Sequence, residues 1–290
     1  MASANPFTPS SAAFRLSHWL DAAEQVGLDR FPVNVELLAK DVGKSLKWPD
    51  HIVEIKAANI TGFEGGLFHL DDRGWVLLYN SQFMSPGRVR FTQAHELGHY
   101  MLHRNLQESF ECSQADMLQW GDQQKLLETQ ADEFACTLLM PMKQFRASTS
   151  VQQIDFDVLS AASIKFGVSL TAACLRWIRS TEESAILVLS RDGYIDWSVS
   201  SEKAFSNGAF IKTRGLTVEL PEGSLAADGS KASSRGGERI ALKTWFKYAH
   251  PDTIVREMKI GCDNYGYMLS LLHLSPSDKV WAPTEWEQKS

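Results

Sequence analysis

The sequence contains the pattern His-Glu-x-x-His at His95, Glu96 and His99, within a segment whose periodicity predicts a helix over about residues 88–104. Two helical residues four apart lie about 40° apart around the axis and one turn apart along it, so both imidazoles can bind one metal ion. Glu96 lies about 60° from His99, where its carboxylate can act as a general base toward an attacking water. These residues therefore predict metal-dependent hydrolysis. The alternative is an exposed helix with two histidines by chance, a pattern expected roughly 0.01 times in a chain of this size.

A catalytic zinc ion usually takes three protein ligands, so the sequence should contain one more. His103 is a poor choice because it lies about 12 Å along the helix axis from His95, too far for both to bind one ion. We expect His103 to cap the end of the helix or to support a neighbouring residue. Tyr100 is a weak candidate for a hydrogen-bond donor to the developing oxyanion.

Glu128 is the better third ligand. It lies near the start of a second predicted helix, about residues 125–139, which can pack antiparallel beside the first through its small residues Ala131 and Ala135. Asp132, one turn further along the same face, can accept a hydrogen bond from the free N–H of a ligating imidazole. The alternative role for Glu128 is that of a solvated acid at the start of the helix. Two imidazoles and one carboxylate suit zinc, with manganese or iron as alternatives.

These two segments resemble the ImmA/IrrE family of metallopeptidases. The resemblance runs through residues 88–103 and resumes at residues 128–141, which follow the pattern ExxAxxFAxxLLMP. It implies a zincin-like peptidase fold that binds zinc through the two histidines and the glutamate, with Glu96 as the general base. It also implies a narrow substrate, a helix-turn-helix repressor whose cleavage derepresses stress, DNA-damage or phage-defence genes.

The predicted elements divide the chain into three parts with an α+β fold. Residues 1–145 mix helices and strands and would form the zincin-like metallopeptidase domain. Residues 146–182 look like a helix-turn-helix (HTH-like) pair, similar to the helical segment that often follows in the family. Residues 183–290 match the family weakly, but their strand-rich pattern is compatible with the mixed α/β GAF-like sensor domain that some members carry.

Periodicity and turn residues give the expected positions of these elements. Helices are expected at residues 11–27, 33–43, 88–104 and 125–139, with two short helices within 151–180. Strands are expected at residues 52–56, 66–70, 75–80, 185–190, 194–199, 208–213, 253–260 and 265–274. Residues 105–124 should be irregular, and the Gly- and Ser-rich residues 221–237 should form a mobile loop. The strand at 75–80, if it lies at an edge of its sheet, could pair with an extended substrate.

The composition indicates a globular protein. Of its 290 residues, 44% are hydrophobic and 22% are charged. No apolar run approaches the roughly 20 residues needed to span a bilayer, and residues 1–20 lack the pattern of an export signal, so we expect a cytoplasmic protein with no membrane partner. The net charge of −6 argues against a protein that coats nucleic acid through bulk charge.

Cys112 could regulate the predicted metal site. It lies in the polar connection between the two helices that carry the predicted ligands. A thiolate there could occupy the fourth position on zinc and displace the catalytic water, which would keep the enzyme inactive. The alternative is an ordinary loop cysteine.

Residues 201–260 contain ten Lys or Arg and seven Asp or Glu, with Trp245, Phe246 and Tyr248 among them. Such a stretch could stack single-stranded DNA or line a pocket for a small-molecule ligand, and the C-terminal part would then be a sensor that gates the enzyme. The alternative is a core stripe with a solvated charged face.

Two other functions are alternatives to an enzyme. The helix pair within 151–180 suggests a DNA-binding regulator, but its second helix, about residues 170–175, offers almost no side chains that could contact base edges. A metal-dependent regulator without hydrolytic activity would have no need of Glu96. The presence of Glu96 therefore favours the enzyme.

Overall fold

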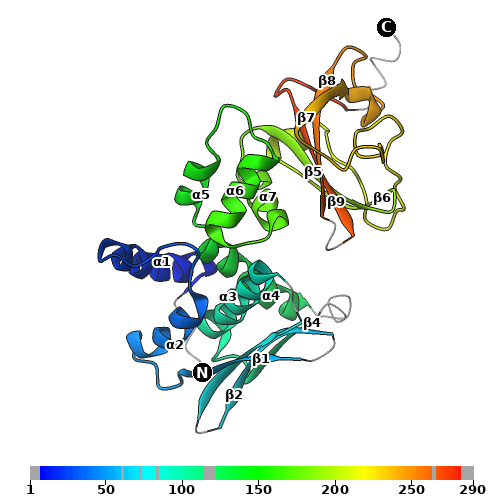
Figure 1. Ribbon diagram of the computed structural model, residues 1–290. Helices are drawn as coiled ribbons and strands as arrows, with labels where there is room; N and C mark the ends of the chain where they lie inside the picture. The colour runs from blue at the N-terminus through cyan, green and yellow to red at the C-terminus, as the bar shows by residue number, and fades with distance from the viewer. Residues whose placement is uncertain are drawn as a thin grey trace. The chain divides into compact units, whose positions relative to one another are not determined.

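The computed structural model describes residues 7–59, 62–71, 73–82, 85–113, 122–262 and 266–281. It contains two β-sheets accompanied by helices, which confirms the α+β class (Figure 1). The chain divides into two compact units: unit 1 is Met1–Ala147 with Ser163–Ser169, and unit 2 is Ser148–Ala162 with Leu170–Ser290. The division passes through the helix α6 (Phe156–Phe166), so each unit includes part of residues 146–182.

The sheet of unit 1 has four strands in the order β1-β3-β2-β4, namely β1 (Ile52–Ala58), β2 (Phe63–Leu70), β3 (Gly74–Asn80) and β4 (Ser109–Ser113). β1 is parallel to β3, and the other two pairs are antiparallel. β3 lies inside the sheet, so residues 75–80 are not an edge that a substrate strand could extend. Within the described residues the outer strands are β1 and β4.

β4 forms where the sequence predicted an irregular connection. The strand is short and mostly polar, so its own pattern is too weak to predict it. It forms because its backbone pairs with residues 63–68 of β2 and because Phe110, 1% exposed, is buried in the core. Both contacts depend on a distant segment of the chain, which no local pattern reveals.

Helices α1 (Pro9–Gln25), α2 (Val35–Ser45), α3 (Pro86–His103), α4 (Asp122–Leu139) and α5 (Met142–Thr149) accompany this sheet. α3 packs against β2, β3 and α4 (Figure 1). The helices α3 and α4 approach closely, since a Cβ at Gly98 would lie only 3.1 Å from Ala131 Cα. Ala131 and Ala135 are fully buried, which agrees with the predicted packing through small residues.

α6 and α7 (Leu170–Ile178) are joined by a tight turn in which Gly167 adopts a φ of +62°, a conformation that favours glycine. Asp155 caps α6 by accepting hydrogen bonds from the backbone N–H groups of Asp157 and Val158. Among the described residues no single helix is long and apolar enough to cross a membrane, and only this pair, bent by 111°, reaches that length and composition when taken together.

The sheet of unit 2 has five antiparallel strands in the order β6-β5-β9-β8-β7. The strands are β5 (Ser184–Arg191), β6 (Tyr194–Ser200), β7 (Ser233–Ala241), β8 (Ile254–Cys262) and β9 (Tyr267–Leu274). Two short segments, α8 (Glu202–Ser206) and η1 (Leu242–Thr244), lie between strands in the sequence. The core of the unit includes Ile186, Trp245 and Leu272. The GAF-like description of this part stays a prediction.

The strand predicted at residues 208–213 does not form. Ala209 is buried and Ile211 packs against the core, and their carbonyl oxygens accept hydrogen bonds from the hydroxyls of Ser200 and Ser198. The alternation of apolar residues in this segment therefore reflects burial of an irregular backbone, without pairing to a further strand.

The mobile loop predicted at residues 221–237 is only partly a loop, because β7 begins at Ser233. Part of the remainder is held against β8 by two fully buried charged side chains. Glu257 accepts a hydrogen bond from the backbone N–H of Ala226, and the Lys259 ammonium donates to the carbonyl of Asp228. Buried charges require partners, so these two contacts hold residues 226–228 against β8.

Candidate metal centre

α3 holds the predicted catalytic segment against the sheet, and every residue from Ala94 to His103 is buried. Glu96 is 0% exposed. A Cβ at Gly65 of β2 would lie 2.8 Å from Glu96 Oε1 and 2.4 Å from Thr92 Cγ2. Glycine at position 65 therefore lets the strand pass this close to Glu96. In the sequence Gly65 directly precedes the strand predicted at residues 66–70, and only the packing of α3 on β2 shows that it lies beside Glu96.

The side chains of His95, His99 and Glu128 converge between α3 and α4, and all three are buried. His95 Nε2 and His99 Nε2 are 3.0 Å apart. Glu128 Oε2 lies 3.0 Å from His95 Nε2, and Glu128 Oε1 lies 3.4 Å from His99 Nε2. A tetrahedral zinc ion with bonds of about 2.0–2.1 Å separates its ligand atoms by about 3.3 Å. The three donors therefore fit one zinc ion, and their chemistry also suits manganese or iron.

Further side chains hold these donors in place. Asp132 Oδ1 accepts a hydrogen bond from His95 Nδ1–H at 2.9 Å, and Gln124 Nε2 donates to Glu128 Oε1 at 2.9 Å. The ring of Phe110 stacks on the ring of His99, with centroids 4.6 Å apart and planes 21° apart. Gln124 and Phe110 belong to no recognisable motif, so the sequence offered no signal for either.

Burial and the neighbouring carboxylates set the protonation of the cluster. Burial by itself lowers the pKa of His95, but the hydrogen bonds to Asp132 and Glu128 outweigh it and raise this pKa to about 10. Burial lowers the pKa of His99 to about 4. Burial also raises the pKa of Glu128, yet the interactions with His95 and His99 outweigh this effect and leave the pKa below its usual range. At neutral pH the metal-free cluster therefore holds a proton on His95, between two carboxylates, where a metal cation would take its place.

The comparisons with known proteins agree with this site. The model of the IrrE N-terminal-like domain, of the Peptidase M78 family, matches residues 50–177, which include all of α3 and α4. The segment that carries the site is thus similar to an IrrE N-terminal-like domain. The match confirms the resemblance to the ImmA/IrrE family and indicates a metallopeptidase with a zincin-like fold.

No curated protein matches the chain. Among solved structures, a Mycobacterium tuberculosis transcriptional regulator is similar, with 12% sequence identity and a TM-score of 0.51. The similarity covers 91% of this chain and 76% of that chain. At this identity the similarity concerns the fold alone.

Tyr100 and His103 contact different groups. The Tyr100 hydroxyl donates to the carbonyl of Asp50 at 2.8 Å, and burial raises the pKa of Tyr100. This hydroxyl holds the backbone of the domain, so the weak prediction of an oxyanion donor finds no support. His103 does not form the helix cap, which is Arg104, and its ring instead contacts His99, with the two Nδ1 atoms 3.1 Å apart.

Cys112 falls at the limit of the described part of the domain. Its backbone lies in β4, paired with Gly65 of β2, and its side chain lies outside the described residues. Gly65 is the residue that β2 brings next to Glu96. Cys112 therefore lies in β4, the strand that pairs with β2, and β2 is the strand that contacts Glu96.

Zinc binding to the cluster of His95, His99 and Glu128 is expected to strengthen as the pH rises. Because the pKa of His95 is raised to about 10, the metal must displace a proton from His95 at any pH below that value. The zinc affinity should therefore increase by about tenfold per pH unit between about pH 6 and pH 8. Competition with a chromophoric chelator, corrected for the chelator's own protonation, measures this dependence. An affinity independent of pH over that range would contradict it.

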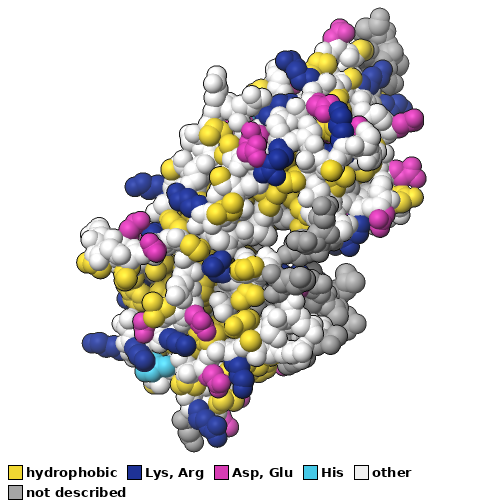
Figure 2. Space-filling model, in the orientation of Figure 1, with side chains coloured by type: hydrophobic (Ala, Val, Ile, Leu, Met, Phe, Trp, Pro, Cys, Tyr) yellow, Lys and Arg dark blue, Asp and Glu magenta, His cyan; other side chains and the backbone are white. Residues whose placement is uncertain are grey.

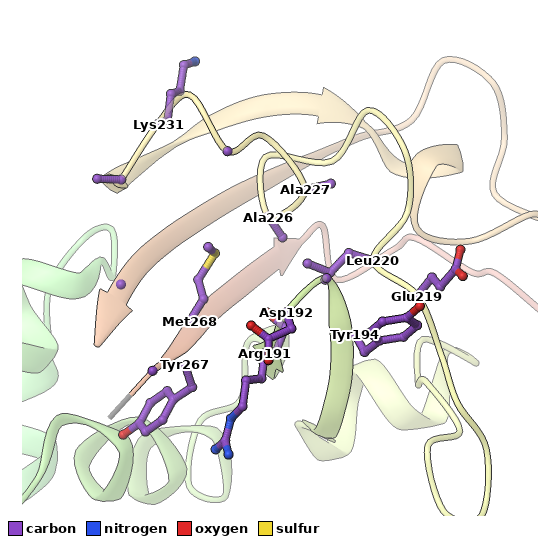
Figure 3. A pocket seen from close by; sticks show the side chains of 16 residues that line it. Arg191, Asp192, Tyr194, Glu219, Leu220, Ala226, Ala227, Lys231, Tyr267 and Met268 are labelled. Carbon is purple, nitrogen blue, oxygen red and sulfur yellow. The ribbon is translucent and has the colours of Figure 1, made fainter. Parts of the chain in front are cut away.

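Unit 2 contains a hollow of about 590 Å³ (Figure 3). It is lined by residues of β5, β6 and β9 and of the segment before β7. Leu220, Ala226 and Met268 supply apolar lining. The charged side chains do not converge on a common point: Lys231 extends away from the hollow and pairs with Glu238. The hollow therefore offers space for a small ligand without a preformed cluster of charges.

Two of the three aromatic residues that the sequence analysis singled out in the basic stretch belong to the core. Trp245 and Phe246 are buried in the core of unit 2, and Tyr248 is 50% exposed. Trp245 Nε1 donates to the buried carboxylate of Glu257. On the face shown in Figure 2, Lys and Arg side chains are interspersed with Asp and Glu. Trp245 and Phe246 therefore fit the alternative interpretation, a core stripe, and the exposed Tyr248 does not.

Proposed function

We propose that the chain is a cytoplasmic, zinc-dependent endopeptidase of the HExxH…E type, which cleaves a helix-turn-helix transcriptional repressor and thereby derepresses stress, DNA-damage or phage-defence genes. The observation that carries this proposal is the convergence of His95, His99 and Glu128, whose ligand atoms lie within 4.8 Å of one another. The match of residues 50–177 to a peptidase family supports the activity. The similar solved structure is named a transcriptional regulator, which is consistent with an effect on gene expression.

In the proposed mechanism His95, His99 and Glu128 hold the zinc ion. Bound zinc supplies a Lewis acid that polarises the peptide carbonyl and lowers the pKa of a coordinated water to about 7. Glu96 accepts a proton from the attacking water and then donates it to the nitrogen of the leaving amine. Asp132 holds the His95 ring through Nδ1, which keeps the ligand atom oriented toward the other two donors.

An extended substrate segment would bind along β4. Within the described residues β4 is an outer strand of the sheet, and its Phe110 stacks on His99. An added strand could pair its backbone with an outer strand by β-augmentation. A substrate bound in this way would lie next to the strand that contacts the metal ligands, which brings a peptide bond near the proposed zinc ion.

The proposal is tested by incubating the purified, zinc-loaded chain with candidate helix-turn-helix repressors, chosen first from any that the neighbouring genes encode. Mass spectrometry of the products should show one defined cut, absent after treatment with a chelator and restored by zinc. Zinc binding without cleavage would favour a non-hydrolytic regulator. Specific binding of the chain to operator DNA, without cleavage, would favour a DNA-binding regulator.

Replacement of Cys112 by alanine is expected to raise the basal cleavage rate by roughly tenfold or more, because a thiolate on zinc would displace the attacking water. The position of its backbone opposite Gly65 supports this switch. The initial rate without any inducing signal is the measurement, and Cys262→Ala in β8 is the matched control. Equal rates for Cys112→Ala and the parent chain would remove Cys112 from the mechanism.

For unit 2 we propose a sensor role in which a small-molecule ligand, in preference to single-stranded DNA, gates the peptidase. The hollow lined by Leu220, Ala226 and Met268 supports a small ligand. The burial of Trp245 and Phe246 removes two aromatic rings that could have stacked on bases. The thermal unfolding temperature is measured with nucleotides and, separately, with a single-stranded oligonucleotide. A rise with the oligonucleotide alone would contradict the proposal of a small-molecule ligand.

A further inference from the structure

A chain of three side chains extends from the metal cluster to α4. His103 follows His99 by one helical turn, and its side chain is almost completely buried, with 2% of the residue exposed. The two Nδ1 atoms of these rings are 3.1 Å apart. On its other side, His103 Nε2 lies 2.8 Å from the side-chain oxygen of Gln130 in α4.

The chemistry of these three groups fixes where the protons lie. An amide oxygen only accepts hydrogen bonds, so His103 Nε2 carries a proton and donates it to Gln130. A neutral imidazole carries a single proton, and in His103 the contact with Gln130 places that proton on Nε2. His103 Nδ1 is then an acceptor, so the donor across the 3.1 Å contact is His99 Nδ1–H. The other nitrogen of that ring, His99 Nε2, is left with a lone pair directed at Glu128 and His95.

We propose that His103 and Gln130 are positioning residues that hold His99 in the tautomer with its proton on Nδ1, so that Nε2 is presented to the metal. The inference rests on the proposed metal centre. Asp132 makes the corresponding contact directly to His95. α4 therefore provides the ligand Glu128 and also a hydrogen-bond partner for each imidazole. Asp132 contacts His95 directly, and Gln130 acts on His99 through His103.

The test compares two replacements of His103 that separate hydrogen bonding from packing. Gln at position 103 keeps an oxygen that can accept from His99 Nδ1–H but loses the ring. Phe keeps a ring next to Phe110, whose centroid lies 6.0 Å from that of His103, but accepts no hydrogen bond. Zinc affinity, measured by competition with a chromophoric chelator, should fall by about 10–100-fold in His103→Phe. It should stay within about threefold of the parent chain in His103→Gln, since the acceptor is retained.

A packing role predicts the reverse order, with phenylalanine tolerated better than glutamine, and that order would overturn the proposal. So would equal zinc affinities for the parent chain and His103→Phe. The absorption spectrum of bound Co²⁺ is a second measurement, expected to change in His103→Phe and to be preserved in His103→Gln. Circular dichroism of the metal-free variants confirms that each is folded.

Gln130→Leu gives an independent test that leaves both histidines in place. It removes the acceptor for His103 Nε2–H, so zinc affinity is expected to fall by about tenfold. Gln123→Leu, the same change at an exposed position of α4, is the matched control and should bind zinc like the parent chain. Equal affinities for these two variants would overturn the role of Gln130.

The outcome for this inference can be separated from the outcome for the proposed function. Every measurement here is of metal binding, so a chain that shows the expected order of affinities but cuts no repressor would refute the proposed cleavage alone. A parent chain that binds neither zinc nor cobalt would overturn both.

Discussion

Replacement of Glu96 by glutamine is expected to lower the rate of repressor cleavage by about 10²–10⁴-fold while zinc binding is retained. Glutamine has nearly the same shape as glutamate, so the close approach of Gly65 to this side chain is preserved. Its neutral amide cannot accept a proton from the attacking water. The loss should therefore appear in the chemical step and not in metal content.

The measurement is the single-turnover rate with excess enzyme, accompanied by the zinc content of the same preparation. Glu108→Gln, the same change at an exposed position, is the control and should cleave at the parent rate. Turnover like that of the parent chain in Glu96→Gln would remove Glu96 from the role of general base. Loss of zinc from this variant would instead make Glu96 part of the binding site.

Replacement of Glu128 by alanine is expected to weaken zinc binding by more than about 100-fold, because loss of an outer partner alone costs about 10–100-fold. Glu128 is one of three donors and the only carboxylate among them. Without it two neutral imidazoles would have to hold a divalent cation. Cleavage should be lost as well, and excess zinc should restore part of it.

Chelator competition measures the affinity, and Asp122→Ala is the matched control, since it removes an exposed carboxylate from the same helix. Circular dichroism of the metal-free variant checks that α4 remains folded. Zinc bound by Glu128→Ala as tightly as by the parent chain would show that the third ligand is another group.

Helix geometry explains how much of the metal centre could be predicted from the sequence. The relation of His95, Glu96 and His99 depends only on the 3.6-residue period, so the pattern predicts that both imidazoles share one face. The small residues Ala131 and Ala135 in the second helix predicted close packing, and both are buried. The spacing of Glu128 made it a candidate, and the structure places its carboxylate within reach of both imidazoles.

The partners of these residues could not be predicted, because they come from segments whose positions depend on tertiary contacts. Phe110 reaches His99 only because β4 pairs with β2. Gly65 lies beside Glu96 only because α3 packs on β2. Gln130 contacts His103 because α3 and α4 pack closely enough at Gly98 and Ala131 for side chains on the two helices to meet.

The sequence by itself determined the chemical groups of the metal centre and their order on two helices, since a periodic backbone fixes the relation between residues one turn apart. The tertiary structure decided which strands lie at the edge of the sheet, which aromatic rings are buried, and which outer side chains orient each imidazole. These features depend on contacts between residues far apart in the chain. Such contacts form only when burial of apolar surface favours one register of the strands and one packing of α3 against α4.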